Sequence, residues 1–423
     1  MKINRYKLID IAILNAQNIN KSDKFTEIEY LDTSSIQEGC ISDIQILDRK
    51  SAPSRAKRKV KNDTIVYSTV RPNLRHYGII KNPPQNFIVS TGFTTIDLKD
   101  EYKEKIFPDY LYLLLSQECI TNYLHGIAQN SVSSYPSINP SDISNLSFLF
   151  PEFTVQQHIA KILTDIDSKI AVNKKIIKEL ETMSKELYDY WFVQFDFPGI
   201  DGKPYKSSGG KIAFNPILKR EIPEGWEIKS INDFCTSYRG VSYDKSDLLD
   251  GPEGGVLVLR GNNIDGNTLV YDDNVAYVPP SFVEPEQKIK KNDIIMTMSS
   301  GSKEHVGKCT MFQANSEHTY GAFMTKFTPN PECPFFAYRS MLSDFFKAKI
   351  KYICGGTGIN NLTNQTFDEI LFPFPPKDVL KEFEKLLTPI YEKVGKNNDE
   401  ILRLTALRDE LLPMLMNGQV RVK

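Results

Sequence analysis

The stretch TVQQHIAKILTDIDSKIAVNKKIIKELETMSKELYDYW, residues 154–191, predicts a long helix around which the rest of the chain is organised. Residues along one side of it follow each other at alternating steps of four and three. That alternation is the 3.5-residue repeat of a helix that packs along one seam against a partner helix. Thr154 and Gln157 have the spacing of a capping box, which predicts the helix start. The seam consists of Ile159, Leu163, Ile166, Ile170, Asn173, Ile177, Leu180, Ser184, Leu187 and Trp191.

A second seam lies 224 residues further along the chain and matches the first without a gap. An asparagine occupies the same rung in both seams, Asn173 in the first and Asn397 in the second. We expect the two helices to pair antiparallel, because each follows a similar domain, and a buried pair of asparagines near the centre would fix their register. The second seam consists of Phe383, Leu387, Ile390, Val394, Asn397, Ile401, Leu404, Arg408, Leu411 and Leu415.

Two prolines and a glycine interrupt the second helical pattern. Pro389 and Gly395 predict a bend or a break near residues 388–396, because an interior proline removes a backbone hydrogen bond. Pro413 is expected to distort or end the last turn, and Asn417-Gly418 is a candidate C-terminal stop.

The two halves of the chain carry similar motifs in the same order. Lys61-Asn-Asp63 recurs as Lys291-Asn-Asp293, and Phe150-Pro151 recurs as Phe374-Pro375. One structural unit used twice produces such a pattern. We therefore expect an α+β protein with two mixed α/β domains separated by two long antiparallel coiled-coil helices. The predicted segments are a first domain (1–151), a central spacer helix (152–197), a linker (198–222), a second domain (223–375) and a C-terminal spacer helix (376–423).

The bulk composition is that of an ordinary globular protein. The 423 residues carry a net charge of −1, with 40% hydrophobic and 25% charged residues. No run of about 18 apolar residues is present, which argues against a membrane span. The six cysteines are scattered, so free thiols in a reducing cytoplasm are expected.

Positive charge gathers in one part of the first half. Between Arg49 and Lys81 there are ten Lys and Arg residues and one acid, Asp63. Cations contact phosphates, and the Asn, Ser and Tyr residues in the same stretch can read base edges. A solvated basic face is the alternative interpretation. The matching window of the second half, residues 279–311, is nearly neutral, with five Lys against four acids.

The sequence carries no convincing catalytic or metal-binding constellation. The five histidines form no zinc pattern, and no phosphate-binding loop ending in Lys-Ser/Thr is present. Asn82-Pro-Pro-Gln85 superficially resembles the Asn/Asp-Pro-Pro-aromatic motif of amino-methyltransferases, but its fourth residue is not aromatic. We interpret it as a turn.

Four segments, in order and spacing, resemble the DNA-specificity (S) subunits of Type I restriction–modification enzymes. They are Leu31-Asp-Thr-Ser-Ser-Ile-Gln-Glu-Gly39, Ser68-Thr-Val-Arg-Pro72, Thr154-Val-Gln-Gln-His-Ile-Ala160, and Leu407-Arg-Asp-Glu-Leu-Leu-Pro413 followed by Gly418. Together they extend over nearly the whole chain. The first half departs from the pattern, because it lacks the Pro-x-Gly-Trp opening that the second half has at Pro223-Glu-Gly-Trp226.

The resemblance implies a non-catalytic DNA reader. Each of two target-recognition domains would read one half of a bipartite, asymmetric site through the major groove. Methyltransferase subunits, two of them by expectation, would dock on the helices, and restriction subunits would join them. S-adenosylmethionine, ATP and Mg²⁺ are expected on those partners and no cofactor on this chain. The 32 steps from Ile159 to Trp191 span about 48 Å, more than the 34–36 Å of one DNA turn.

Candidate DNA contacts are polar or cationic residues of predicted loops in both halves. In the first half they are Arg55, Lys57, Arg58, Lys59, Arg71, Asn73, Arg75, His76, Gln129, Asn130, Ser133 and Tyr135. In the second half they are Arg260, Asn262, Asn263, Ser299, Ser300, Ser302, Lys303, His305, Thr357, Asn360 and Asn361.

Two alternatives of other classes stay open at this stage. A stand-alone DNA methyltransferase would bind S-adenosylmethionine itself, and only Asn82-Pro-Pro-Gln85 favours it. A coiled-coil scaffold without DNA would need only the two helices.

Overall fold

The computed structural model describes residues 3–131, 135–265, 268–269, 275–302, 304–354 and 361–416. The chain divides into two compact units. The first combines residues 1–172 with residues 401–423, and the second is residues 173–400. Each long helix therefore contributes one part to each unit.

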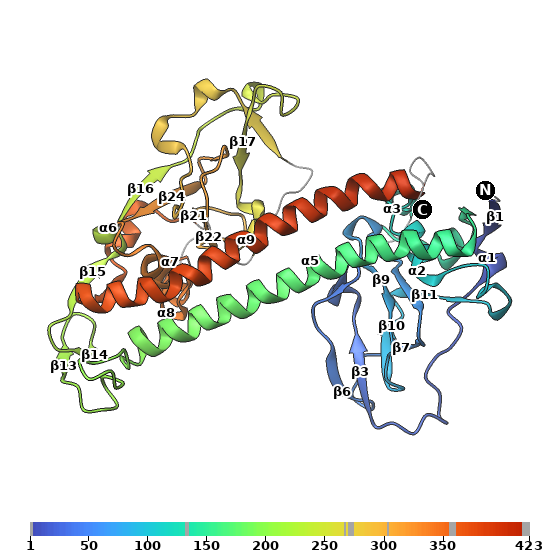
Figure 1. The fold of residues 1–423 in the computed structure, drawn as a ribbon, viewed down its shortest axis with the longest axis horizontal. Helices are drawn as coiled ribbons and strands as arrows, with labels where there is room; N and C mark the ends of the chain where they lie inside the picture. The colour runs from blue at the N-terminus through green and yellow to red at the C-terminus, as the bar shows by residue number, and fades with distance from the viewer. Residues whose placement is uncertain are drawn as a thin grey trace. The chain divides into compact units, whose positions relative to one another are not determined.

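Two four-stranded sheets form the body of the first unit (Figure 1). One has the order β6-β3-β10-β7, with β3 and β10 parallel, and the other has the order β2-β11-β8-β9 and is antiparallel. Their strands are β2 (Ala12–Leu14), β3 (Glu27–Leu31), β6 (Gln45–Asp48), β7 (Ala56–Lys59), β8 (Thr64–Ser68), β9 (Tyr77–Ile80), β10 (Phe87–Ser90) and β11 (Phe93–Leu98). Two short ribbons pair β1 (Asn4–Lys7) with β12 (Ser147–Phe150), and β4 (Ile36–Gln37) with β5 (Cys40–Ile41).

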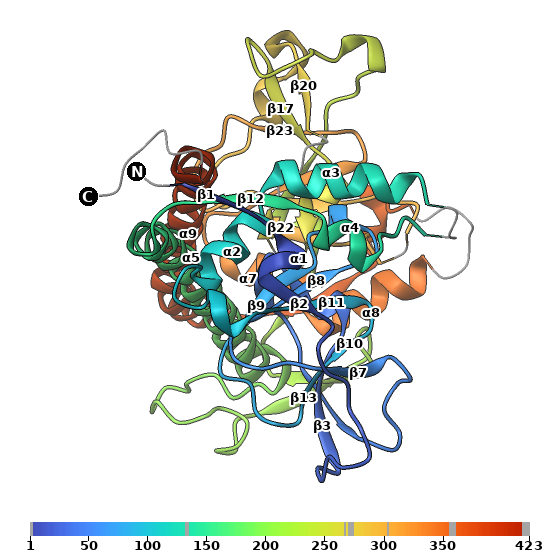
Figure 2. The same ribbon diagram turned by 90° about the vertical axis from the view of Figure 1, so that its right-hand side faces the viewer.

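Helices cover the sheet β2-β11-β8-β9, and the larger core of this unit lies between the sheet and these helices. Figure 2 shows the first unit from this side. One of these helices is α2 (Pro108–Leu115), whose residues 110–115 are all buried. Its neighbours are α1 (Leu8–Ile11), α3 (Glu118–Gln129) and α4 (Pro140–Ser144). Buried Ile65 and Ile96 of the sheet pack in the same cluster as Leu124 of α3 and Leu163 of the long helix.

The second unit repeats this plan. A pair of strands, β15 (Glu227–Ser230) with β25 (Leu371–Phe374), corresponds to β1 with β12. The antiparallel sheet β16-β24-β21-β22 and the sheet β20-β17-β23, with β17 and β23 parallel, complete it. Their strands are β16 (Cys235–Arg239), β17 (Val256–Leu259), β20 (Ala276–Val278), β21 (Ile294–Thr297), β22 (Cys309–Met311), β23 (Thr319–Tyr320) and β24 (Met324–Pro329). The remaining elements are α6 (Ile231–Phe234), α7 (Pro334–Leu342), α8 (Asp344–Ile353) and the ribbon of β18 (Ile264–Asp265) and β19 (Thr268–Leu269).

Strand register shows that the repeat is structural and not only a similarity of motifs. In the first unit Thr94 pairs with Tyr67, and in the second Met324 pairs with Thr297. Both members of the pair are displaced by 230 residues, the offset that the sequence motifs have. The internal repeat predicted from the sequence is therefore confirmed at the level of strand pairing.

The first long helix, α5, extends over Phe153–Tyr188 and continues as one π-helical turn, Asp189–Val193. The predicted helix is thus present, but it begins one residue before Thr154, so the capping-box prediction is wrong. Gln156 anchors its first turn instead. The Gln156 side chain donates to the carbonyl groups of Lys105 and Pro151 and accepts from the Phe107 N–H.

The second long helix, α9, extends without interruption over Lys377–Met416. The break expected near residues 388–396 is absent, and Pro413 does not end the helix. An interior proline lowers the stability of a helix by about 3 kcal/mol. Here the buried side chains Leu387 and Tyr391 flank Pro389 and stabilise the helix on both sides of it. The proposed stop at Asn417-Gly418 lies outside the described residues.

The seam residues of both helices lie on their packed faces. All eighteen apolar and asparagine rungs named above are buried or half-buried. Within the first unit, Ile159 and Leu163 of α5 share a cluster with Leu411 and Leu415 of α9. Within the second unit, the ring of Phe192, in the turn that continues α5, lies 4.7 Å from that of Phe383 in α9. Early residues of one helix thus meet late residues of the other in both units, which is antiparallel pairing.

The two seam asparagines are buried, but they do not form the expected pair. The Asn173 side chain donates to the Glu400 carboxylate at 2.9 Å. Asn397 Nδ2 is buried without a hydrogen-bond partner among the described residues. The register of the antiparallel helices places Glu400, one helical turn away from Asn397, opposite Asn173.

The segment 198–222 contains more than a linker. Strands β13 (Ile212–Asn215) and β14 (Arg220–Pro223) form an antiparallel hairpin that precedes strand β15. Phe195 and Phe197, just before this segment, pack on Trp226. No helix in the described part of the chain has an apolar stretch long enough to cross a membrane.

Candidate functional site

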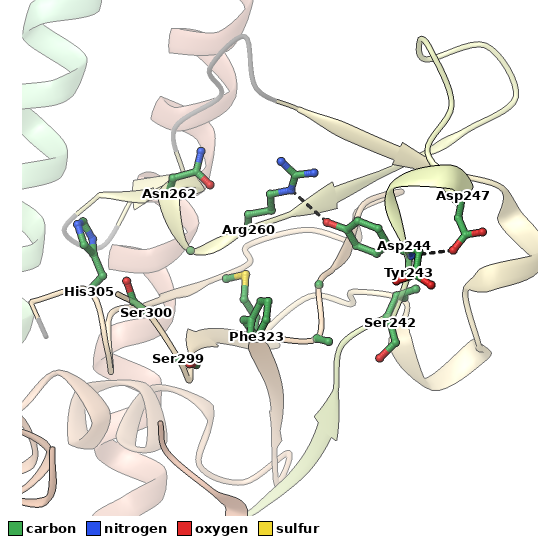
Figure 3. Close-up of a pocket in the computed structure, with 15 residues that line it drawn as sticks. Ser242, Tyr243, Asp244, Asp247, Arg260, Asn262, Ser299, Ser300, His305 and Phe323 are labelled. Carbon is green, nitrogen blue, oxygen red and sulfur yellow. Dashed lines mark hydrogen bonds between the residues drawn. The ribbon is translucent and has the colours of Figure 1, made fainter. Parts of the chain in front are cut away.

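A cavity of about 800 Å³ opens between the loops of the second unit (Figure 3). Four segments line it: the loop after β16, the turn after β17, the loop after β21 and the turn that leads into β24. Five of the sequence-predicted candidates lie on its wall, namely Arg260, Asn262, Ser299, Ser300 and His305. Residues from distant parts of the sequence therefore meet in one place, as a binding site requires.

Arg260 is fixed at this wall by two hydrogen bonds. Its backbone N–H donates to the side-chain oxygen of Asn263 at 2.8 Å, which caps the short helical turn that follows β17. Its side-chain Nε donates to the Tyr243 hydroxyl at 3.1 Å, the bond drawn in Figure 3. In the described parts of the chain no carboxylate forms an ion pair with this guanidinium.

Close backbone packing holds Tyr243 beside Arg260. The N–H of Val241 donates to the Tyr320 carbonyl at 2.8 Å, and the N–H of Gly321 donates to the Leu259 carbonyl at 2.9 Å. A side chain at Gly240 would collide with the backbone carbonyl of Gly321. Only glycine permits this approach, which ties the loop that carries Tyr243 to the end of strand β17, directly before Arg260.

The other candidates of the second half have different surroundings. Asn263 is buried and caps the turn, so it is a structural residue and not an exposed contact. Asn361 is exposed and forms a β-bridge with Ser299 at the cavity wall, and Ser302 is exposed nearby in the chain. Lys303, Thr357 and Asn360 lie outside the described residues.

Ten of the fifteen lining residues were not predicted from the sequence, among them Tyr243, Asp244, Asp247 and Phe323. Phe323 is 71% exposed, which is unusual for a phenylalanine and places an aromatic ring at the cavity wall. Its counterpart in the first unit, Phe93, is fully buried. The Gly-Val-Ser-Tyr-Asp run at 240–244 is polar and glycine-led, which is the signal that could have identified this loop.

The equivalent loops of the first unit also come together. The backbone N–H of Thr69 donates to the Gly92 carbonyl at 2.9 Å, and Thr91 donates to the Arg55 carbonyl at 2.8 Å. Val70 forms a β-bridge with Ser137, as Ser299 does with Asn361 in the second unit. The loops after β8 and β10 and the loop before β7 therefore converge, and the contact between Arg55 and Asp32 adds the loop after β3.

Arg55 belongs to this loop cluster and has an ion-pair partner. Its guanidinium contacts the Asp32 carboxylate at 3.2 Å and remains 58% exposed. Asp32 also accepts from the Tyr30 hydroxyl at 3.2 Å and the Thr33 N–H at 2.8 Å. The exposed guanidinium is thus held by a carboxylate that is itself fixed in position.

A second group of candidates surrounds the short 3₁₀ turn Pro72–Leu74. Arg71 is exposed, and its guanidinium lies 5.0 Å from the ring centre of Tyr135. Asn73 is exposed, whereas Arg75 forms an ion pair with Glu38 at 2.8 Å. Arg71 and Arg75 both have positive φ, 48° and 55°, a backbone conformation that is uncommon for residues other than glycine.

His76 follows this turn and is half-buried. Burial lowers the pKa of His76 below its usual value, and the charge of Asp32 opposes that shift. A lowered pKa keeps the imidazole neutral near pH 7, so we expect a hydrogen-bonding rather than a cationic side chain.

Strand β7 carries three of the basic candidates in three different environments. Lys57 is exposed, and within the described residues its ammonium group has no carboxylate partner. Lys59 pairs with Asp23 at 2.6 Å. Arg58 is half-buried with an unsatisfied Nε, and burial lowers its pKa. The large positive charge of the sequence window is therefore partly neutralised by acids from elsewhere in the fold.

The candidate residues at the end of α3 contact other residues of the same helix. Gln129 lies 3.1 Å from the His125 ring, and Asn130 donates to the Gly126 carbonyl at 3.1 Å. Ser133 lies outside the described residues. No cluster of His, Cys, Asp or Glu that suits a metal ion occurs among the residues that the structure describes.

The loops of both units offer hydrogen-bond donors and acceptors and arginine guanidinium groups. Each also has an exposed aromatic ring, that of Tyr135 in the first unit and that of Phe323 in the second. Such a set can bind phosphates and read base edges, as guanidinium and amide groups do in DNA grooves.

Comparison with known proteins decides between the remaining interpretations. The sequence model of the family described as Type I restriction modification DNA specificity domain matches residues 4–182 and again residues 223–405. The chain belongs to this family. As a member it is a specificity subunit, which recognises DNA and performs no catalysis itself. The two matches correspond to the two halves of the internal repeat.

Relatives of the specificity family match along most of their length. The Type I restriction enzyme HindI specificity subunit of Haemophilus influenzae is 25% identical and aligns with 98% of this chain and 99% of its own. The MjaIX specificity subunit of Methanocaldococcus jannaschii is also 25% identical, over 84% of this chain and 77% of its own. The fold resembles the crystal structure of the S subunit from M. genitalium, with a TM-score of 0.55, 14% identity and 98% and 96% coverage of the two chains. The predicted fold class is confirmed.

Proposed function

We propose that each half of this specificity subunit reads one part of a bipartite, asymmetric DNA site. The observation that supports it most is the recurrence of one loop cluster in both units, with different residues in each. The cluster holds Arg55 and Asp32 in the first unit and Arg260 and Tyr243 in the second. Because the two sets differ in charge and shape, they suit different base sequences.

In this proposal residues 1–151 and 223–375 are the two recognition domains. Exposed cations outside the loop clusters, Lys57 foremost, bind phosphates and position the domains. Arg260, Asn262, Ser299 and Ser300 in the second domain, and Arg55, Arg71 and Asn73 in the first, face the DNA. The cavity of the second domain faces the major groove.

The helices α5 and α9 set the spacing between the two half-sites. With 36 residues α5 is about 54 Å long, which exceeds one turn of DNA. Their outer faces dock two methyltransferase subunits, and restriction subunits join that complex. S-adenosylmethionine, ATP and Mg²⁺ are bound by these partners in the cytoplasm.

Selection of random DNA duplexes with the chain and its methyltransferase partner tests the proposal. We expect enrichment of two short conserved blocks separated by a spacer of fixed length and free sequence. A single continuous block, or no enriched sequence at all, would contradict the bipartite reader. The second outcome would favour a scaffold whose helices act without DNA contact.

Exchange of the recognition domains provides the matched test. A chain whose residues 223–375 are replaced by the corresponding domain of a relative should keep one block of its site and change the other. A change of both blocks would show that the halves do not read independently.

A further inference from the structure

We propose that Arg260 reads a guanine in the DNA half-site of the second domain and that Tyr243 is its positioning residue. The inference rests on the proposed function, because it assumes that the cavity of the second unit faces DNA. Three observations carry it: the orientation of the guanidinium, its lack of an acidic partner, and the contrast with the first domain.

The bond from Arg260 Nε to Tyr243 restricts how the guanidinium can bind a base. Arginine contacts the O6 and N7 atoms of guanine with two parallel N–H donors. With Nε already donating at 3.1 Å, the two terminal nitrogens remain for the base, so the group approaches end-on. Fixing Nε also reduces the rotamer freedom that a long side chain loses on binding.

No acid neutralises this guanidinium within the described residues. Asp244 and Asp247 line the same cavity but form no ion pair with Arg260. The Asp247 carboxylate instead accepts from the Asp244 backbone N–H at 2.7 Å, the second bond drawn in Figure 3. A half-buried cation beside 800 Å³ of open space is thus left for a ligand that accepts two hydrogen bonds.

The first domain carries the opposite charge at the corresponding place. Asp32 follows Leu31, the last residue of β3, as Arg260 follows Leu259, the last residue of β17, and Ile36 and Ile264 come directly after the two turns. A carboxylate cannot donate to guanine, and the nearby guanidinium, that of Arg55, is shared with Asp32. The corresponding positions therefore present a carboxylate in the first domain and a guanidinium group in the second. The two domains bind different bases there, which makes the DNA site asymmetric.

The test uses the full chain assembled with its methyltransferase partner and a duplex that carries the selected site. Each guanine of the second half-site is replaced in turn by 7-deazaguanine, which lacks the N7 acceptor. For the wild-type complex we expect one guanine at which this replacement weakens binding about 10- to 100-fold. In the Arg260→Gln complex the same replacement should have no effect, while the first half-site is read as before.

Tyr243→Phe isolates the positioning role, because it removes one oxygen and leaves the ring in place. We expect the 7-deazaguanine effect to shrink several-fold at that guanine and nowhere else. A merely structural hydroxyl would leave the effect unchanged at that base. Unchanged sensitivity in Tyr243→Phe would remove the positioning role of Tyr243.

The results separate failure of this inference from failure of the proposed function. If the wild type selects a bipartite site but Arg260→Gln stays sensitive to the same 7-deazaguanine, or if the second half-site contains no guanine, the role of Arg260 is wrong and the bipartite reader stands. If the wild type selects no bipartite site, the proposed function fails first. Should Arg260→Gln bind no DNA at all, the Tyr243→Phe result decides.

Discussion

Asn173 on α5 donates a 2.9 Å hydrogen bond to Glu400 on α9, whereas Asn397, on the corresponding rung of α9, buries its Nδ2 without a partner among the described residues. The two rungs are equivalent in sequence but not in the folded helix pair. One asparagine is satisfied and the other carries an uncompensated desolvation cost.

Replacing Asn397 by Leu should therefore stabilise the second unit, by about 1 to 2 kcal/mol, because a buried unsatisfied donor is removed. Asn173→Leu should lower stability by a similar amount, since Glu400 loses a donor. Urea unfolding followed by tryptophan fluorescence measures both, because Trp191 and Trp226 are buried in the second unit. Equal effects of the two substitutions would contradict the asymmetry.

Phe323→Ala should weaken DNA binding by the assembled complex several-fold and leave the free energy of unfolding nearly unchanged. The ring is 71% exposed, so little packing is lost. Phe327→Ala, in strand β24 just after Phe323, is the matched control: its ring is fully buried, and we expect a loss of about 3 to 5 kcal/mol of stability. Unaltered DNA affinity in Phe323→Ala would show that this ring does not contact DNA.

Lys57→Ala should lower the affinity for all DNA sequences alike and reduce the slope of log K against log salt by about 1, as the loss of one phosphate contact does. Lys59→Ala should change the slope less, because Asp23 already neutralises Lys59 at 2.6 Å. Titration at four salt concentrations distinguishes them. Identical slopes for both variants would mean that Lys57 is a solvated surface residue.

Glu384 links the stability of the second unit to pH. Its carboxylate accepts from the backbone N–H groups of Phe335 and Phe336, and burial, which those hydrogen bonds oppose, raises the pKa of Glu384 to about 7. The unfolded chain loses this proton near pH 4.5. The folded state retains the proton up to about pH 7, so the free energy of unfolding falls as the pH rises through this window.

We expect the stability of the wild type relative to Glu384→Gln to fall by about 2 to 3 kcal/mol between pH 5 and pH 8. The variant has no titrating group at this place, which makes it the control for all other carboxylates. Urea unfolding at a series of pH values checks the difference. A constant difference over this range would show that the carboxyl titrates normally.

The helical seams and the repeat were predictable because they depend on spacing along the chain. A 3.5-residue alternation places Ile159 and Leu163 on one side of a helix whatever surrounds it. The repeat needed only the order of motifs such as Lys61-Asn-Asp63 and Lys291-Asn-Asp293. Both features survive in the folded chain.

Local rules failed where packing opposes them. The sequence predicted a bend or break at Pro389, but the buried residues Leu387 and Tyr391 on either side favour one continuous helix. The basic window 49–81 predicted a strongly positive face. In the fold, Lys59 and Arg75 are neutralised by Asp23 and Glu38, which lie outside that window.

The sequence by itself determined the family, the two-fold repeat and the two long helices, because these follow from periodicity and the order of motifs. Only the tertiary structure decided which candidates are available to a ligand. Tyr243 meets Arg260 across seventeen residues, and Phe323 is exposed where Phe93 is buried. Such contacts depend on loop approach and side-chain packing in three dimensions, which no spacing along the chain encodes.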